Sequence, residues 1–149
     1  MSSACIPTSS CQEYRRGNFL ISTDPAKLDI AAIHAFLTRG YFDTEGIDQE
    51  TVARSVQGSL CFGVYDGQQQ VGFARVITDF ATFAYFCDDY ILESHRGQGL
   101  AKWLMDCVLK HPGLRHLRRW ILGPTRDTRL YEKFGFKPVE SQWMELKPS

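Results

Sequence analysis

One segment of the sequence combines residue types that bind anions. It reads Glu-Ser-His-Arg-Gly-Gln-Gly-Leu-Ala over residues 93–101, after an apolar run typical of a strand and before an amphipathic stretch typical of a helix. A strand that enters a helix through two glycines leaves several backbone N–H groups unpaired at the positive end of the helix dipole. Gly97 and Gly99 let a ligand approach that backbone closely, and Arg96 adds a cation. The segment therefore predicts a site for a phosphate or pyrophosphate group.

Two other phosphate-binding motifs do not match this segment. A dinucleotide-binding fingerprint needs a third glycine at the position of Lys102, and a P-loop needs Gly-Lys followed by Ser or Thr. A purely structural alternative stays open, in which Gly97 and Gly99 only shape a tight turn between a strand and a helix.

The composition favours one soluble domain. Of the 149 residues, 44% are hydrophobic and 13% aromatic, which suffices for one core. Lys and Arg together number 17, as do Asp and Glu, and this balance argues against nucleic acid as a partner. The sequence has no run of about 18 apolar residues and no leader-like start, so we expect no membrane association and a cytoplasmic location. Five cysteines without a CxxC spacing argue against a metal site.

Hydrophobic periodicity predicts the elements that position the anion-binding segment. Residues 1–13 are polar and aperiodic, and we expect a flexible N-terminal tail there, followed by a single domain over 14–149. The pattern predicts an α/β fold of the mixed α+β kind, with a central, mostly antiparallel sheet flanked by helices. The expected strands are 19–22, 60–65, 71–78, 83–92, 120–122 and 138–146, and the expected helices are 24–38, 48–57, a long one from Leu100 up to Pro112, and 128–134.

Two segments together resemble a known family. Arg96-x-x-Gly99-x-Ala101, after a strand and before an amphipathic helix, is similar to the acyl-CoA pyrophosphate signature of the GCN5-related N-acetyltransferase (GNAT) family. Further downstream, the sequence Leu-Tyr-Glu-Lys-Phe-Gly-Phe at 130–136 resembles that family's closing Leu-Tyr-x-Lys-x-Gly-Phe motif. The resemblance covers roughly 60–136 and implies a GNAT-like fold, whose sheet splays between its fourth and fifth strands.

The resemblance implies acetyl-CoA as co-substrate. Its pantetheine would pair with strand backbone where the sheet splays, and its pyrophosphate would lie on the loop before the long helix. Arg129 and Lys133 are candidates for the 3′-phosphate, although a solvated helix face explains them equally well. Many family members have Asn before the last helix, where this chain has Pro-Thr-Arg-Asp at 124–127, so a side-chain contact to pantetheine is not carried over. The implied cofactor-binding residues are Ile91, Leu92, Arg96, Gly97, Gln98, Gly99, Leu100 and Ala101.

The resemblance also assigns a catalytic acid. Tyr131 would stand near the thioester sulfur and protonate the departing thiolate. The alternative is that Tyr131 only packs in the core, because Leu130 and Phe134 beside it are apolar.

A base for the attacking amine is expected on the strand at 83–92. Alternation of side chains predicts Tyr85, Cys87, Asp89 and Ile91 on one face and Asp88 on the other. Asp89 is our candidate base, since a carboxylate in a partly buried cleft has a raised pKa. The alternative is that Asp89 is exposed or structurally paired.

These observations predict an N-acetyltransferase that moves an acetyl group from acetyl-CoA to an amine by direct attack. Basic residues concentrate in 110–133 and acidic ones in 43–50, which favours a cationic amine if the acidic segment borders the acceptor site; solvated faces would give the same counts. We expect a small-molecule amine rather than a macromolecule. The alternative function is a non-catalytic acyl-CoA sensor or partner module. Homodimers are common in the resembling family, and an exposed final strand could pair.

Overall fold

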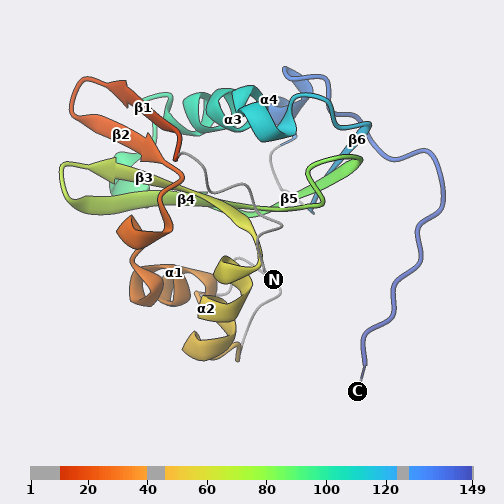
Figure 1. The fold of residues 1–149 in the computed structure, drawn as a ribbon, viewed down its shortest axis with the longest axis horizontal. Helices are drawn as coiled ribbons and strands as arrows, with labels where there is room; N and C mark the ends of the chain where they lie inside the picture. The colour runs from red at the N-terminus through yellow and green to blue at the C-terminus, as the bar shows by residue number, and fades with distance from the viewer. Residues whose placement is uncertain (1–10, 40–45, 124–127, 149) are drawn as a thin grey trace.

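The computed structural model describes residues 11–39, 46–123 and 128–148 (Figure 1). Its centre is one six-stranded sheet with the order β1-β2-β3-β4-β5-β6. Neighbouring strands are antiparallel from β1 to β5, whereas β6 runs parallel to β5. The strands are β1 (Glu13–Arg16), β2 (Phe19–Ser22), β3 (Leu60–Asp66), β4 (Gln69–Thr78), β5 (Phe83–Ile91) and β6 (Arg119–Leu122). This is the mixed, mostly antiparallel sheet that the sequence predicts.

Helices cover both faces of the sheet (Figure 1). One face carries α1 and α2, which pack Ile33, Phe36 and Val52 against Phe73 and Tyr90 of the sheet. The other carries α3, whose apolar stripe closes the larger core, and α4. The helices are α1 (Ile30–Leu37), α2 (Gln49–Gln57), α3 (Leu100–Lys110) and α4 (Arg129–Glu132), with short 3-10 turns at Pro25–Lys27, Glu93–His95 and Pro112–Leu114.

The single helix expected at 24–38 is wrong, because two aspartates each begin a helical segment. The Asp24 carboxylate accepts a hydrogen bond from the Ala26 N–H and caps only the turn Pro25–Lys27. Leu28 and Asp29 are extended, and the Asp29 carboxylate then caps α1 by accepting from the Ala32 N–H at 3.0 Å. Asp is a strong N-cap residue, so the second cap interrupts the helical period.

The two ends of the described chain also differ from expectation. The strand expected at 138–146 is absent from the described sheet, and residues 137–148 carry no regular secondary structure. Instead, β1 forms a hairpin with β2 that the sequence analysis missed. The Gln12 N–H donates to Thr23 Oγ1 at 2.9 Å, and Ser22 Oγ donates to Glu13 Oε2 at 2.9 Å. Of the tail expected at 1–13, residues 1–10 lie outside the described residues.

Tyr65 provides a test of core packing. Its hydroxyl is buried over Gly63, where a Cβ atom would lie 2.3 Å from it, and it has no hydrogen-bond partner among the described residues. A buried, unsatisfied hydroxyl costs about 1–3 kcal/mol. Tyr65→Phe keeps the ring and removes this cost, so we expect the free energy of unfolding to rise by about 1 kcal/mol in urea denaturation.

Gly63→Ala is a control for which we expect the opposite effect, a lower free energy of unfolding. The added methyl group would meet the Tyr65 ring, and overpacking of this kind costs about 1–3 kcal/mol. A fall in stability on Tyr65→Phe would instead mean that the hydroxyl is satisfied in solution.

Candidate active site

The loop before α3 has the backbone that its glycines predict. Gly97 and Gly99 have φ angles of +82° and +80°, in the left-handed region that residues with a Cβ rarely adopt. Gly99 is the N-cap of α3, and no side chain caps this helix end. The cap residue therefore offers no side-chain acceptor to the N–H groups of the first turn. Free N–H groups at the start of a helix are suited to bind an anion.

Side chains of the loop hold it against the sheet. Arg96 Nε donates to the Ile91 carbonyl at 3.0 Å, and His95 Nε2 lies 3.0 Å from Asp66 Oδ2 at the end of β3. Gln98 Nε2 donates to the His95 carbonyl at 3.3 Å. These bonds connect the loop to β3 and β5 and also link residues within the loop. The backbone that is expected to bind an anion is therefore preorganised.

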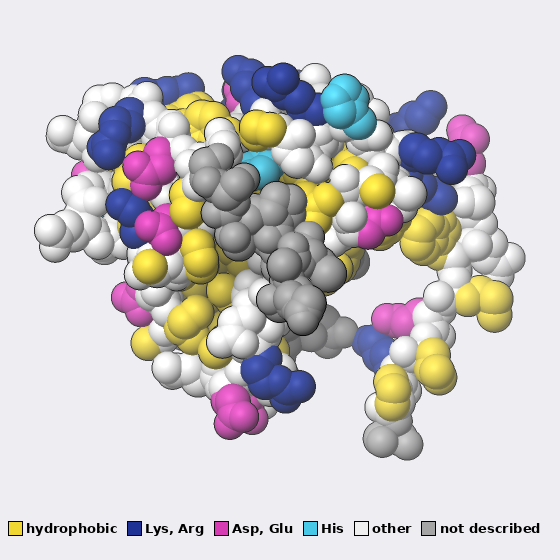
Figure 2. Space-filling model, in the orientation of Figure 1, with side chains coloured by type: hydrophobic (Ala, Val, Ile, Leu, Met, Phe, Trp, Pro, Cys, Tyr) yellow, Lys and Arg dark blue, Asp and Glu magenta, His cyan; other side chains and the backbone are white. Residues whose placement is uncertain are grey.

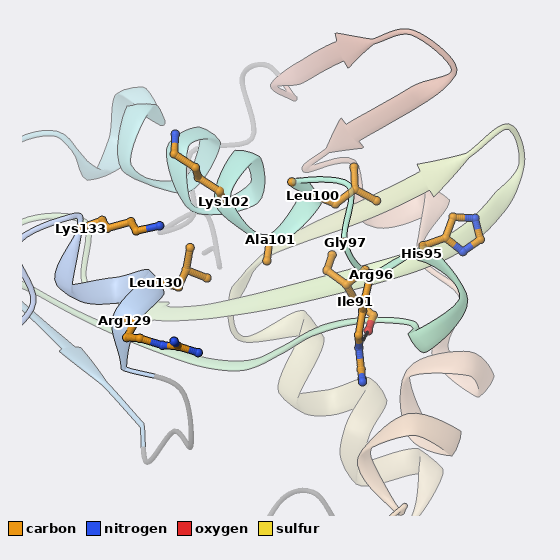
Figure 3. Close-up of a pocket in the computed structure, with 11 residues that line it drawn as sticks. Ile91, His95, Arg96, Gly97, Leu100, Ala101, Lys102, Arg129, Leu130 and Lys133 are labelled. Atoms are coloured by element: carbon orange, nitrogen blue, oxygen red, sulfur yellow. Dashed lines mark hydrogen bonds between the residues drawn. The ribbon is translucent and has the colours of Figure 1, made fainter.

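A cavity of about 450 Å³ opens between this loop and α4 (Figure 3). It collects cationic side chains from three elements, namely Arg96 from the loop, Lys102 from α3, and Arg129 and Lys133 from α4. Four cations around one cavity match the charge of a nucleotide phosphate group. The expected binding residues that line it are Ile91, Arg96, Gly97, Gly99, Leu100 and Ala101, whereas Leu92 and Gln98 do not.

A smaller cavity of about 160 Å³ adjoins the first, since both are lined by Ile91, Arg96 and Ala101. It extends along β5 to Asp89 and Tyr131, the two expected catalytic residues. The cationic cavity therefore adjoins a cavity lined by two groups that can exchange a proton, Asp89 and Tyr131.

The sheet is open where these cavities lie. Pairing between β5 and β6 ends at Phe86 and Leu122, while β5 continues to Ile91. The Leu92 N–H donates to the Val71 carbonyl at 2.8 Å on the β4 side. Each residue of an antiparallel strand directs its N–H and its C=O to the same side, and that side changes from one residue to the next. Because the Leu92 N–H points toward β4, the Ile91 N–H and C=O point away from β4.

Of the two backbone positions expected to pair with pantetheine, only Ile91 turns a donor toward the opening. Its carbonyl accepts from Arg96, which leaves the N–H for a ligand. Both backbone groups of Leu92 are bonded within the protein, because its carbonyl accepts from the His95 N–H at 2.9 Å. The Leu92 backbone therefore positions the loop, and the contribution of this residue to cofactor binding stays a prediction.

The expected alternation along β5 is wrong, because a β-bulge interrupts it. Phe73 pairs with Tyr90, and Arg75 pairs with Cys87. The one β4 residue between Phe73 and Arg75 therefore lies opposite two β5 residues, Asp88 and Asp89. Asp88 has a φ of +56°, a conformation that Asp adopts more readily than most residues. Because of the extra residue, side chains after the bulge lie on the opposite face from the one that regular alternation predicts. Cys87 and Asp89 consequently lie on opposite faces.

The bulge brings Asp89 to Tyr131, on the face that carries α3 and α4. Tyr131 Oη donates a hydrogen bond to Asp89 Oδ2, and the Tyr131 ring packs edge-on against Phe86 and Phe136, each at a centroid distance of 6.2 Å. Burial raises the pKa of Asp89, and the hydrogen bond from Tyr131 offsets part of that rise. The two residues expected to act as acid and base therefore form one hydrogen-bonded pair.

Asp88 lies on the other face, where it belongs to a structural ion pair. Arg75 Nε donates to Asp88 Oδ2 at 2.9 Å, and Arg75 Nη1 donates to Ser59 Oγ at 3.1 Å. Both charged side chains are less than one-fifth exposed. This contact, which the sequence analysis missed, fixes the bulge and so orients Asp89 indirectly.

The nearby cysteines do not supply a nucleophile. Burial raises the pKa of Cys61 to about 12 and that of Cys87 to about 12, so both remain thiols at neutral pH. Cys87 also faces away from Asp89. Within the described ranges, no cluster of His, Cys, Asp and Glu could hold a metal ion. None of the helices in those ranges has the length and apolar character needed to cross a bilayer.

Fold and site together define an enzyme class, the acyltransferases that take their acyl group from a CoA thioester. A family model described as "Acetyltransferase (GNAT) domain" matches residues 57–138, which include the glycine loop, β5 and Tyr131. The chain belongs to the GNAT acetyltransferase family.

Individual relatives agree with this assignment. A Gibberella zeae protein named as an acetyltransferase is 33% identical over 142 residues, covering 82% of this chain and 80% of its own. The crystal structure of a GNAT-family protein from Xanthomonas campestris pv. campestris is 41% identical, with a TM-score of 0.82 over 87% of this chain and 94% of that one. A Clostridium acetobutylicum acetyltransferase crystallised with acetyl-CoA shares the fold, at 16% identity and a TM-score of 0.58 over 87% and 95% of the two chains.

Proposed function

We propose that the protein transfers the acetyl group of acetyl-CoA to the amine of a small molecule by direct attack. The observation that carries the proposal is the hydrogen-bonded pair of Tyr131 and Asp89, which lies in a cavity adjoining the cationic one. The cationic cavity suits the CoA phosphates, and the Ile91 N–H suits the thioester oxygen, whose charge grows as the amine attacks.

The paired groups suit the proton transfers that the reaction needs. Deprotonating an amine of pKa ~10.4 at pH 7 costs about 4.6 kcal/mol, so a positioned base contributes substantially. Asp89 takes the first proton from the ammonium and releases it to solvent, so that the nitrogen attacks as a neutral amine. Asp89 then accepts the second proton, which the nitrogen loses as the carbon–nitrogen bond forms, and Tyr131 gives its proton to the sulfur as the carbon–sulfur bond breaks. The proton on Asp89 then returns to the Tyr131 oxygen through their hydrogen bond. One proton moves from nitrogen to sulfur, and both residues return to their starting states.

The charge pattern supports a small, cationic acceptor. Arg129 and Lys133, from the basic segment 110–133, line the phosphate-sized cavity, so this segment serves the donor rather than a nucleic acid. Part of the acidic segment 43–50 lies outside the described residues, and its contribution to the acceptor site stays a prediction. The balanced net charge favours a small amine over a macromolecular polyanion.

Turnover with a panel of amines tests the proposal. Release of free thiol from acetyl-CoA is followed with mono- and polyamines, amino acids and amino sugars, and acylated products are identified by mass spectrometry. Amine-dependent thiol release supports the enzyme. Tight acetyl-CoA binding without acceleration by any amine would favour the alternative, a non-catalytic acyl-CoA sensor.

The raised pKa of Asp89 predicts the pH dependence of the rate. The base must be ionised, so kcat should rise with pH through a pKa above the ordinary carboxyl value of ~3.9. Asp89→Asn preserves an acceptor for the Tyr131 hydroxyl but cannot take a proton. We expect the variant to lose this acidic limb and about 10²-fold in kcat.

Stability gives a second readout of the same pKa. The folded protein holds the Asp89 proton more tightly than the unfolded chain, so the contribution to stability is complete below pH ~3.9 and declines as pH rises through the folded pKa. Asp89→Asn should remove that decline in urea denaturation. Glu140→Gln, at an exposed position that lines neither cavity, is the control and should leave both profiles unchanged. An unaltered pH–rate profile in Asp89→Asn would eliminate Asp89 as the base.

A further inference from the structure

The hairpin of β1 and β2 lies beside the beginning of α3 (Figure 1). Lys and Arg side chains gather along the upper rim of the molecule, over the hairpin and α3 (Figure 2). Two contacts join the tip of the hairpin to the glycine loop and the helix. The Phe19 ring packs edge-on against His95 at a centroid distance of 6.3 Å, and the Arg16 guanidinium lies 4.7 Å from the Trp103 ring centroid. The hairpin therefore borders the loop that is expected to bind an anion.

The direction of the Arg16 side chain follows from its place in β1. Side chains alternate along a strand, and Tyr14 packs against the core that contains the apolar stripe of α3, so Arg16 also points to that face. Glu13 and Arg15 point to the opposite face, where their side chains lie 3.9 Å apart. Of the two adjacent arginines, Arg16 is thus the one directed toward α3.

The Arg16 guanidinium reaches the N-terminus of α3. A Cβ atom at Gly99, the N-cap residue, would lie 3.9 Å from Arg16 Nη1. Within the part of the chain that the structure describes, no carboxylate forms an ion pair with Arg16. The contact with the Trp103 ring uses none of the guanidinium N–H groups, so these donors are available to a ligand.

The charges around Gly99 are all positive. Arg16 lies beside the positive end of the α3 dipole, and Arg96 adds a second cation from within the loop. Like charges at short separation are unfavourable unless an anion lies among them. The cation–π contact with Trp103 holds Arg16 in place, so an anion on the loop gains a charged donor that is already positioned.

We propose that Arg16 is a further phosphate-binding residue, which holds the pyrophosphate of CoA on the glycine loop from the side of the first hairpin. Arg129 and Lys133, the candidates for the 3′-phosphate, lie on α4, on the other side of the start of α3 (Figure 3). Arg16 instead adjoins Gly99, whose backbone is expected to bind the pyrophosphate. The inference rests on the proposed function only in that the loop binds CoA, and it is independent of the acceptor.

Titration calorimetry with CoA tests the proposal on the full chain. Arg16→Met removes the charge but keeps an unbranched apolar chain over Trp103, so cooperative thermal unfolding should be retained. We expect the affinity for CoA to fall about 10-fold, and the difference from the parent to shrink at high salt. Arg15→Met is the matched control, since it makes the same change at the adjacent position on the opposite face, and it should bind CoA as the parent does.

Dephospho-CoA identifies the phosphate that Arg16 contacts. This ligand keeps the pyrophosphate and lacks the 3′-phosphate, so Arg16→Met should weaken its binding by the same factor as that of CoA. A loss that appears with CoA but not with dephospho-CoA would assign Arg16 to the 3′-phosphate and overturn the proposal. Parent-like affinity of Arg16→Met for both ligands would overturn it equally.

Turnover separates this inference from the proposed function. In an active acetyltransferase, Arg16→Met should raise the KM for acetyl-CoA and leave kcat unchanged, because a pyrophosphate contact stabilises substrate and transition state equally. A parent that binds CoA but acetylates no amine, with the loss of affinity in Arg16→Met intact, would contradict the proposed enzyme and still support Arg16 as a ligand to phosphate. A parent that does not bind CoA would overturn both.

Discussion

Tyr131→Phe is expected to lower kcat by about 10²–10³-fold, with the affinity for acetyl-CoA unchanged. The variant keeps the ring contacts with Phe86 and Phe136 and removes only the hydroxyl that donates to Asp89. The leaving thiolate then has no positioned acid, and the proton on Asp89 has no path back. Steady-state thiol release gives kcat, and titration calorimetry gives the affinity for acetyl-CoA.

Tyr65→Phe is the matched control for this experiment. It deletes a tyrosine hydroxyl from β3, at a buried position outside both cavities, and kcat should be unaffected. If Tyr131→Phe keeps the full rate, the Tyr131 ring serves only the core and the acid lies elsewhere.

The double variant Arg96→Ala/Gly99→Glu is expected to weaken acetyl-CoA binding by at least about 10²-fold. Loss of Arg96 removes one cation and frees the Ile91 carbonyl, so the loop loses its bond to β5. A glutamate at position 99 strains a backbone with φ of +80° and places a negative charge where the phosphates would bind. Isothermal titration with acetyl-CoA and with CoA measures the effect.

Arg54→Ala/Gly46→Glu controls for charge and strain. Gly46 also has a positive φ, +81°, with open space around a Cβ, and Arg54 lies on α2 across the sheet. This variant changes the net charge equally and should bind acetyl-CoA as the parent does. If the parent itself does not bind, the glycine loop is only a turn, and the proposed function and its sensor alternative both fail.

The loop and the helix after it could be predicted because their signals are local. Two glycines spaced by one residue, followed by an amphipathic period through Leu100, Trp103 and Leu104, specify a turn and a buried helix face within one short window. A motif of similar length led to the prediction that Tyr131 is the catalytic acid, and the structure places this residue in the smaller cavity. The cationic cavity was only partly predictable, since Lys102 meets Arg129 and Lys133 through packing of α3 against α4.

Features that depend on a partner strand could not be predicted in this way. The bulge at Asp88 arises from a mismatch in residue number between β4 and β5, which β5 alone does not reveal. A positive φ at Asp88 leaves only a weak signal in the residue type. The pattern at 138–146 is typical of a strand, but a strand also needs a neighbour, and the described chain supplies none there.

The bulge in β5 also affects how this strand is compared with others. Relative to a regular strand, Asp88 is an insertion, so an ungapped alignment to a bulge-free relative would equate the wrong one of two adjacent aspartates with a catalytic position. Deleting Asp88 would restore regular pairing and keep Asp89, Tyr90 and Ile91 on their present faces. A shift in the register between β5 and β4 would have to move the bulge to another residue and break the hydrogen bond between Arg75 and Asp88. The inserted residue thus fixes the strand register at the open end of the sheet, where β6 no longer does so.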